Sequence, residues 1–381
     1  MHRHGGGVRP PIRLAPRLAL ALAIASVFFA GRADAQGAPV RIDEDARSVP
    51  SGVLRVGIST DFEYTEKLRL PDGKQVPLAR RLGFDSTTDN VVASSAVSIT
   101  RLRLALDYGV TRWLAIGASA PLVRRRVEAS ADTNVLQAPL TSRKKRVTDF
   151  SALTGFTRTN VGDIDFTARI ALFDNTRRGA PLRLRVAAEG GFRLAAGPSR
   201  SVNSMLDPGA GDGQNDVIAA VFADVALGGR WSVAAAASRT WQRQDRQTIL
   251  LADSLYPSEQ IRRGVARDLG DLTAIMIAPR YRLTRYIQFA ASASQLTKTA
   301  DRYSGAVPDE GWGLVAPPGG SYGITRAGLG IVFSTMPNGG AVGSWPAEIV
   351  FEHSQIVHSS GAAVPDTRVD RLGGRLYIKL F

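Results

Sequence analysis

The sequence predicts an all-β protein, a transmembrane antiparallel up-and-down β-barrel of about 12 strands with short periplasmic turns and long extracellular loops. Three observations predict this fold. An export signal opens the chain, pairs of alternating apolar and polar runs are joined by tight turns, and the last residue is the aromatic Phe381. A barrel strand shows one face to lipid and the other to a polar interior, so its side chains must alternate with period two.

The first 35 residues have the features of a secretory signal peptide. Basic residues precede the uninterrupted apolar run Leu18–Ala30, and Ala33-Asp-Ala35 fits the small-residue cleavage pattern. This run is too short to cross a bilayer as a helix, which takes about 20 residues. We therefore expect residues 1–35 to be cleaved, 36–50 to form a short periplasmic segment whose acidic Asp43-Glu-Asp45 could occupy the barrel mouth, and 51–381 to form the barrel.

Composition excludes several classes of site. The chain has no cysteine, so it can hold no disulfide framework, thiolate metal site, cysteine nucleophile or lipoprotein anchor. The formal net charge is +14, but the cations are spread along the chain instead of forming one helical stripe, which does not indicate a nucleic-acid partner. Lumen lining and contact with anionic lipid head groups account better for the excess.

Alternation is clearest in the runs 98–108, 161–173 and 182–194, where apolar residues take every second position and charged residues lie between them. Helical spacing would scatter these charges onto the apolar face. An Arg facing the bilayer midplane costs about 2–4 kcal/mol, so we expect the charges to point into the barrel. The expected lumen-lining residues are Arg101, Arg103, Asp163, Asp165, Arg169, Arg183, Arg185, Glu189 and Arg193. They can line a pore or pair with one another and close a small lumen, and barrel size leaves both open.

Extended along the chain, the pattern predicts strands in order near residues 52–67, 91–108, 112–127, 161–173, 181–196, 215–228, 230–245, 268–283, 285–299, 321–335, 346–359 and 366–381. The faces are less distinct in 268–283, where Ile275 and Met276 are adjacent. An even number of strands places both termini in the periplasm.

The connections alternate in length, as in outer-membrane barrels. Short turns are expected at Gly109–Arg112, Asp174–Pro181, Gly228-Gly229 and Leu283–Arg285, with a longer Gly/Pro turn at Pro337–Pro346. Long loops are expected at 68–90, 128–160, 197–214, 246–267 and 300–320. Aromatic residues recur beside the short turns and predict a girdle at the inner head-group boundary. They are Tyr108, Trp113, Phe173, Trp231, Tyr281, Tyr286 and Trp345.

Four blocks are similar in order and spacing to a known family. They are Tyr108–Val123, Asn160–Arg169, Phe192–Gly197 and Gly211–Asp216. Over residues 50–381 the chain resembles the outer-membrane transporter-like family named after meta-pathway phenol degradation. It departs from the family at Leu194-Ala-Ala-Gly197, where members carry Leu-Pro-Thr-Gly. The resemblance implies a barrel that moves small hydrophobic or aromatic compounds.

Catalytic and metal sites have little support in the sequence. His353 and Ser354 have the residue types of a hydrolase site, but adjacent strand residues face opposite sides. His353 and His358 are five apart and are likewise expected on opposite faces, unsuited to one ion. The run Gly209–Asp216 lacks the ligand spacing of a calcium loop and predicts a Gly-rich turn. No phosphate-binding or dinucleotide motif is present, so no cofactor is expected.

These observations favour a passive channel of the bacterial outer membrane for small solutes. A non-transporting structural or surface-binding barrel is the main alternative, and an outer-membrane hydrolase is a weaker one. The expected partners are outer-membrane lipid and lipopolysaccharide, a small-molecule solute and the barrel-assembly machinery, with no nucleic acid. The basic cluster Arg143–Arg146 in the longest loop could contact lipopolysaccharide phosphates, or simply be solvated.

Overall fold

The computed structural model describes Ile42 and residues 46–78, 92–131, 155–175, 183–199, 209–252, 260–305, 313–314, 320–336 and 346–380. The chain divides into two units, Met1–Ala30 and Gly31–Phe381, and the fold reported below is that of the second. The expected signal peptide, Asp43–Asp45, the basic cluster Arg143–Arg146 and Trp345 lie outside the described residues.

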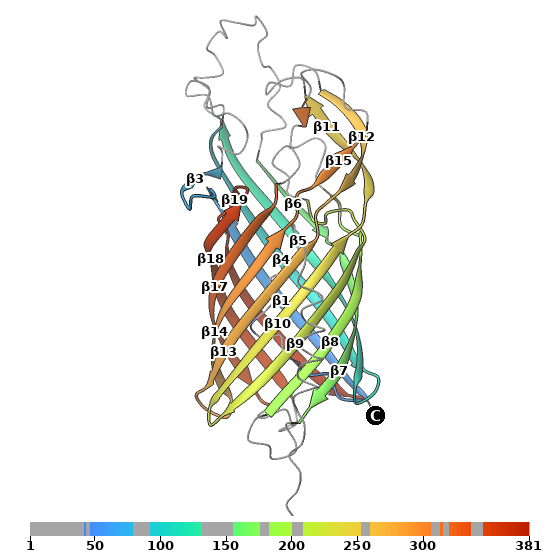
Figure 1. Ribbon diagram of the computed structural model, residues 1–381, viewed down its shortest axis with the longest axis vertical. Helices are drawn as coiled ribbons and strands as arrows, with labels where there is room; N and C mark the ends of the chain where they lie inside the picture. The colour runs from blue at the N-terminus through green and yellow to red at the C-terminus, as the bar shows by residue number, and fades with distance from the viewer. Residues whose placement is uncertain are drawn as a thin grey trace, which may run out of the picture. The chain divides into compact units, whose positions relative to one another are not determined.

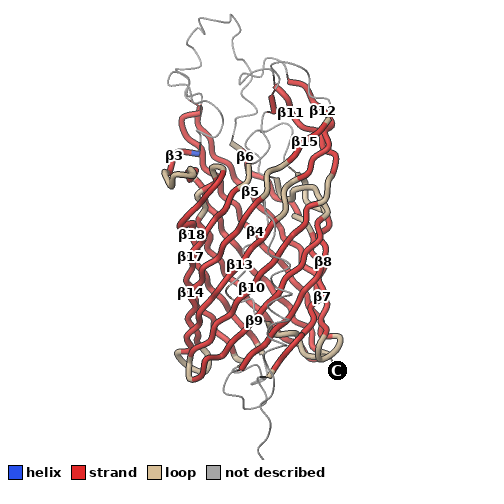
Figure 2. Tube along the Cα trace, in the orientation of Figure 1, coloured by secondary structure: helices blue, strands red, loops and turns tan. Residues whose placement is uncertain are grey.

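Twelve antiparallel strands close into a barrel, as the sequence predicts (Figures 1 and 2). Strand β1 (Val53–Thr65) pairs with β4 (Val92–Gly109) on one side and with β20 (Arg368–Lys379) on the other, which joins the first and last barrel strands. The others, in order around the wall from β4, are β5 (Leu114–Ala131), β7 (Ile164–Asp174), β8 (Arg183–Leu194), β9 (Asp216–Gly228), β10 (Trp231–Gln242), β13 (Leu272–Arg282), β14 (Ile287–Lys298), β17 (Tyr322–Ser334) and β18 (Ala347–Gly361).

The outer face of the barrel is apolar. On β1, Ile58 and Phe62 are 55% and 50% exposed, whereas Ser59 and Asp61 between them are 7% and 4% exposed and face inward. The same alternation on the other strands gives the apolar band that a membrane barrel needs, since a strand shows every second side chain to lipid. Among the described residues, no helix is long and apolar enough to cross a membrane.

The junction between β20 and β1 holds a buried ion triad. Arg371 of β20 donates from Nε to Asp61 Oδ1 at 2.5 Å and from Nη1 to Glu352 Oε2 of β18 at 3.0 Å. All three side chains are nearly inaccessible to solvent. The triad therefore ties together three adjacent strands, including the first and last of the barrel.

One predicted strand is interrupted. The predicted strand 161–173 is present as β7, but a separate strand β6 (Phe156–Val161) precedes it, and both pair with β5. Between them, Gly162 N donates to Pro121 O of β5 at 2.7 Å. Pro121 has no N–H to give to a ladder, so regular pairing cannot pass through this point. Asp163 lies in this break and is buried.

The sequence predicts a long loop at residues 246–267. This prediction is wrong in part, because most of these residues form a β-hairpin. Strands β11 (Asp245–Ala252) and β12 (Gln260–Asp268) continue beyond the barrel wall between β10 and β13 (Figure 1). Their sheet is completed by β15 (Arg302–Ser304) and β16 (Gly313–Leu314). Outside lipid neither face needs to be apolar, so the alternation that reveals a barrel strand is weak here. A third small sheet contains β2 (Lys67–Arg69), β3 (Gln75–Pro77) and β19 (Val364–Pro365).

Two short turns use the same local chemistry. In the β4–β5 turn, Thr111 Oγ1 accepts the backbone N–H groups of Trp113 and Leu114 at 3.2 and 3.0 Å. In the β13–β14 turn, Thr284 Oγ1 accepts those of Tyr286 and Ile287 at 3.1 and 3.0 Å. A threonine hydroxyl that satisfies two such groups ends one strand and starts the next. It also sets an aromatic residue at the start of each following strand.

Candidate lumen site

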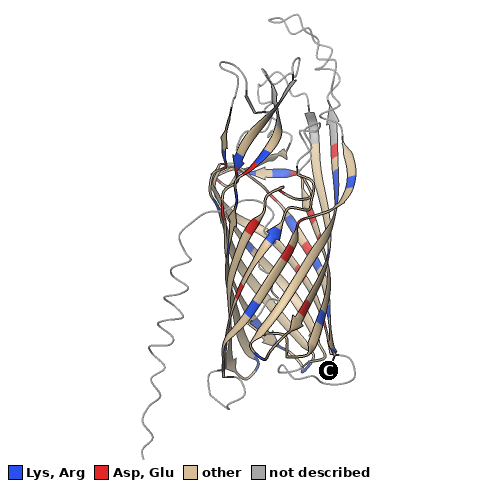
Figure 3. Ribbon diagram, turned by 90° about the vertical axis from the view of Figure 1, so that its right-hand side faces the viewer, with Lys and Arg blue, Asp and Glu red and all other residues tan. Residues whose placement is uncertain are grey.

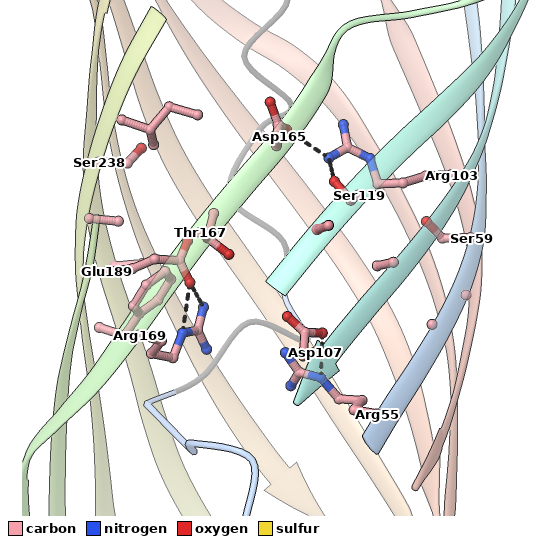
Figure 4. Close-up of a pocket in the computed structure, with 18 of the residues that line it drawn as sticks. Arg55, Ser59, Arg103, Asp107, Ser119, Asp165, Thr167, Arg169, Glu189 and Ser238 are labelled. Carbon is pink, nitrogen blue, oxygen red and sulfur yellow. Dashed lines mark hydrogen bonds and ion pairs between the residues drawn. The ribbon is translucent and has the colours of Figure 1, made fainter. Parts of the chain in front are cut away.

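One side of the lumen is lined by ion pairs. Three of them are visible in Figure 4, where each pair of side chains points together from neighbouring strands. Arg55 of β1 is 3.0 Å from Asp107 of β4, and Arg169 of β7 is 2.8 Å from Glu189 of β8. Arg103 of β4 is 3.3 Å from Asp165 of β7. Each pair joins residues on the inward face of adjacent or nearly adjacent strands, because alternation leaves only that face for charges.

The opposite side of the lumen is apolar. On β9, β10 and β13 a buried apolar cluster lies in the middle of the inward faces, and it contains Ala220, Phe222, Ala234, Ala236, Ala274, Met276 and Ala278. Phe222 is 3% and Met276 is 1% exposed. Arg169 lies over the Phe222 ring at 4.2 Å from its centroid, which marks the boundary between the two sides.

Both surfaces meet at a cavity of about 220 Å³. We call its two sides the charged wall and the apolar wall. The charged wall consists of Arg55, Arg103, Asp107, Asp165, Arg169, Glu189, Arg193 and Arg375, on β1, β4, β7, β8 and β20. The apolar wall consists of Ile218, Ala220, Phe222, Ala236, Leu272, Ala274, Leu296 and Val350, on β9, β10, β13, β14 and β18. Small hydroxyl residues, such as Ser119 and Ser238, lie among them.

The chain ahead of β1 contacts the inside of the barrel. Ile42 is fully buried against Ala290 and Val350, and its carbonyl oxygen accepts a 2.6 Å hydrogen bond from Arg280 Nη2. Arg47 Nη2 lies 2.8 Å from Glu348 Oε1. These contacts hold Ile42 and Arg47 of the expected periplasmic segment against inward-facing residues of β13, β14 and β18. The side chain of Ile42 rests over Gly330, where any Cβ would meet its Cδ1 atom. The segment therefore narrows the lumen.

A buried polar network lies at the end of the barrel away from the short turns. Asp163 accepts backbone N–H groups from Gly197 at 2.9 Å and Asp212 at 3.1 Å. Asp212 accepts from Gln214 N and from Gln242 Nε2, both at 2.8 Å. Burial raises the pKa of Asp212 to about 6, and the nearby Asp163 carboxylate adds to the rise, although the Gln214 N–H opposes it. The Gly-rich run thus forms a turn that is fixed by its own Asp212 and by Asp163, which precedes β7.

The same network fastens the β11–β12 hairpin. Arg267 of β12 pairs with Asp245 of β11 at 2.8 Å and also donates to Asp212 O at 2.5 Å. Gln214 Nε2 donates to Arg267 O at 3.1 Å. The segment before β9 therefore folds against the hairpin instead of projecting as a free loop. This contact needs the hairpin that the sequence pattern does not reveal.

The residues expected to line the lumen fall into three groups. Arg103, Asp165, Arg169, Glu189 and Arg193 lie on the charged wall of the cavity. Arg101 points inward but pairs with Glu63 of β1 outside it. The rest lie near the strand ends, where Asp163 anchors the polar network, Arg185 pairs with Asp174 at 3.3 Å, and Arg183 is exposed. Figure 3 shows basic and acidic residues interspersed along the barrel strands.

His353 and Ser354 lie on opposite faces of β18, as predicted. His353 is exposed and 2.7 Å from Asp370 Oδ1, whereas Ser354 is 7% exposed and faces inward. His358 differs from expectation, because a β-bulge shifts the register of β18 against β17 and leaves both His358 and Val357 exposed. Five strand residues still separate His353 from His358 by about 16 Å, too far to share an ion. Among the described residues, no group of three acidic or histidine side chains could hold a metal ion.

Sequence patterns did not reveal the apolar wall. The adjacent Ile275 and Met276 made the faces of 268–283 indistinct because both faces of β13 are apolar there: Ile275 is 41% exposed to the outside and Met276 is buried inside. The run Ala234–Ala237 on β10 carries the same signal, since small apolar residues occupy both faces. Such runs could have indicated an interior surface that is not polar.

Comparison with solved structures shows the fold. The barrel matches the crystal structure of an outer membrane channel from Pseudomonas putida F1 with a TM-score of 0.56 and 12% sequence identity, covering 91% of this chain and 100% of that chain. This chain has the fold of the outer-membrane β-barrels. The translocator domain of autotransporter NalP from Neisseria meningitidis matches at TM-score 0.38 and 10% identity, over 95% of both chains. The CymD monoaromatic hydrocarbon channel matches at TM-score 0.33 and 9% identity, over 87% of this chain and 90% of that one.

No family model matches the chain. No curated protein matches it either.

Proposed function

We propose that this protein is a passive channel of the bacterial outer membrane for small, partly hydrophobic solutes. The observation that carries the proposal is the cavity of about 220 Å³ with an apolar wall on one side and a charged wall on the other. A barrel with a purely structural role gains nothing from an unfilled interior, since close packing is the stable arrangement. An apolar core cavity of roughly 150 Å³ is enough to hold benzene, so the space fits a solute with one ring.

The resemblance to the family named after meta-pathway phenol degradation supports an aromatic solute. The apolar outer band supports an outer-membrane location, with lipid and lipopolysaccharide around the barrel and the assembly machinery as the route into the membrane. His353 and Ser354 lie on opposite faces of β18, which supports a channel over a hydrolase at that position.

Solute flux into proteoliposomes tests the proposal. Purified protein in vesicles should raise the uptake of small ring compounds above that of empty vesicles. Because Ile42 and Arg47 hold the N-terminal segment against the lumen wall, the double substitution Ile42→Ala with Arg47→Gln should raise uptake further. Uptake equal to that of empty vesicles, in both the native chain and the double variant, would exclude a channel.

Substitution of Gly330 provides a second test of the same segment. Gly330→Val places a side chain where Ile42 packs, so it should also raise uptake; the new Cβ also meets the backbone oxygen of Phe351, so circular dichroism must first show that the variant barrel is folded. Gly264→Val is the matched control, because a Cβ at Gly264 has open space around it and β12 lies outside the barrel wall. The control should show the uptake of the native protein.

A further inference from the structure

Two exposed arginines lie on the outward face of the barrel, at the top of the apolar band. Arg124 takes the next outward position of β5 after Leu122, and Arg368 begins β20. Each lies about ten residues along its strand from the outward residue at the periplasmic end, Leu114 on β5 and Ile378 on β20. A strand tilted by about 40° rises about 2.5 Å per residue, so about ten residues span a band about 25 Å tall. Both arginines therefore stand at the extracellular edge of this band.

Neither arginine is paired within the molecule. In the part of the chain that the structure describes, no hydrogen bond or ion pair involves the side chain of Arg124 or Arg368. An outward arginine on the other side of the barrel differs, because Arg239 of β10 lies 2.8 Å from Asp271 and 5.2 Å from the centre of the Trp241 ring. Guanidinium groups that can receive an external anion thus lie on the side formed by β5, β4, β1 and β20.

Carboxylates on this side of the barrel are engaged elsewhere. Glu128 lies 2.6 Å from Arg126, and Asp370 lies 2.7 Å from a ring nitrogen of His353. A third carboxylate, Glu66, lies 4.0 Å from the ammonium group of the lysine that follows it. The positive charge of the two arginines is therefore not cancelled by these neighbours.

The outward side chains between the two arginines carry hydroxyl groups. Thr100 of β4 lies directly opposite Arg124, and Tyr64 of β1 lies between Ser98 of β4 and Arg368. Strands β5, β4, β1 and β20 are successive neighbours, so three spacings of about 4.8 Å separate the arginines by about 14 Å. The result is a polar strip with a cation at each end.

The chemistry of this strip fits one component of the outer leaflet. Lipopolysaccharide is anchored by a diglucosamine that carries a phosphate at each end and acyl chains below. Guanidinium groups suit phosphate oxygens, and hydroxyls suit a sugar. The acyl chains would cover Leu122 and Phe62, which are 44% and 50% exposed directly beneath the strip. A phospholipid has one phosphate and would serve one arginine, and a free phosphate ion would leave the apolar residues uncovered.

We infer that the outward face of β5, β4, β1 and β20 binds one lipopolysaccharide molecule in a fixed orientation. Arg124 holds one phosphate of the diglucosamine and Arg368 holds the other, while the hydroxyls of Ser98 and Thr100 face the sugar between them. The barrel thereby has a lipid site on one side of its wall, in addition to the general contact of its apolar band with acyl chains.

Native mass spectrometry of the purified full chain with lipid probes tests the inference without any variant. The probes are lipid A with both phosphates, lipid A with one, lipid A with none, and phosphatidylglycerol. One molecule of the first should bind per barrel, and each phosphate removed should weaken binding by about fivefold, the usual gain from one cation near an anionic surface. Equal binding of the three lipid A forms, or phosphatidylglycerol binding as tightly as the form with both phosphates, would overturn the inference.

Variants assign the effect to the two arginines. Arg124→Gln and Arg368→Gln should each lower the affinity for lipid A with both phosphates by about fivefold. Together they should lower it by about 25-fold, because sites this far apart act independently. Arg124→Lys, which keeps the charge, should lose less than Arg124→Gln. Arg112→Gln is the matched control, because Arg112 is exposed on the turn at the periplasmic end of the same β4–β5 hairpin. A loss in this control equal to that in Arg124→Gln would show that no local site exists.

The lipid site and the channel can fail separately. Neither arginine lines the cavity, and the binding measurement involves no transport. Phosphate-dependent binding of lipid A by a barrel that passes no solute would support the site and reject the channel. Solute uptake by a barrel that binds the three lipid A forms equally would support the channel and overturn the site.

Discussion

The two walls of the cavity share one outer surface but differ completely inside. Behind the charged wall, β4 and β7 expose Leu104 and Leu172 to lipid and turn charged residues inward. Behind the apolar wall, β13 exposes Ile277 to lipid but turns Met276 and Ala278 inward. Lipid therefore fixes the outer side chains of every strand, whereas the inner side chains are free to follow the needs of the lumen. The inner side chains can therefore make a lumen that is polar all round, or, as here, a lumen with one charged wall and one apolar wall.

The largest effect is expected where the charged wall loses a buried arginine. Arg193→Met leaves Asp165 and Asp216 facing a space without their guanidinium, and only Arg103 remains for Asp165. Removing one partner from a buried pair costs roughly 3–5 kcal/mol. Urea unfolding in lipid vesicles would measure the change in the free energy of unfolding. Arg246→Met, on the exposed hairpin, should change it by less than about 0.5 kcal/mol.

Adjacent positions of β13 compare the inside with the outside directly. Met276 is 1% exposed and packs in the alanine-rich cluster, whereas Ile277 is 52% exposed on the lipid face. Met276→Ala should lower the free energy of unfolding by about 2–5 kcal/mol because it opens a hole among fixed neighbours. Ile277→Ala should cost clearly less, since mobile lipid tails fill the space. Equal losses at the two positions would mean that the alanine-rich cluster around Met276 is loosely packed.

The polar network at the extracellular end should respond to pH. The pKa of Asp212 in the folded protein, about 6, is raised by burial from its ordinary value of 3.8, so protonated Asp212 favours the folded network. This contribution is fully present below pH 3.8, falls as pH rises from there through 6, and is absent above that. Protection of the 209–216 amides from hydrogen exchange should therefore be greater at pH 5 than at pH 7.5. Asp212→Asn should flatten the difference, and a native pH profile without any change would contradict the assignment.

The smallest effect is expected at the periplasmic girdle, which both walls share. Trp231 and Tyr281 are cross-strand neighbours on β10 and β13, with ring centroids 4.9 Å apart. A double-mutant cycle with leucine at both positions should give a coupling energy of about 0.5–1.5 kcal/mol in vesicle unfolding experiments. A coupling energy near zero would mean that Trp231 and Tyr281 stabilise the barrel independently of each other.

Period-two alternation was enough to predict the barrel, because all twelve strands must show apolar side chains to lipid at every second position. Strands such as β9 and β14 begin and end within a few residues of their predicted bounds. The lumen was predictable only where its side chains are charged, since charge is what distinguishes the inner face from the outer one in a sequence. Ala236 and Ala274 carry no such mark. The place of Ile42 was not predictable either, because its contacts lie far away on β14 and β18.

The triad of Asp61, Arg371 and Glu352 has a consequence for how the cylinder is completed during assembly. Its members come from the first strand and the last two, so none of its contacts across the seam can form until the whole chain has been delivered to the membrane. A slip of one residue between β1 and β20 would turn Arg371 toward hydrocarbon, at a penalty of about 2–4 kcal/mol near the midplane. The buried ion pairs therefore disfavour a shifted register between β1 and β20 at the step when the barrel closes.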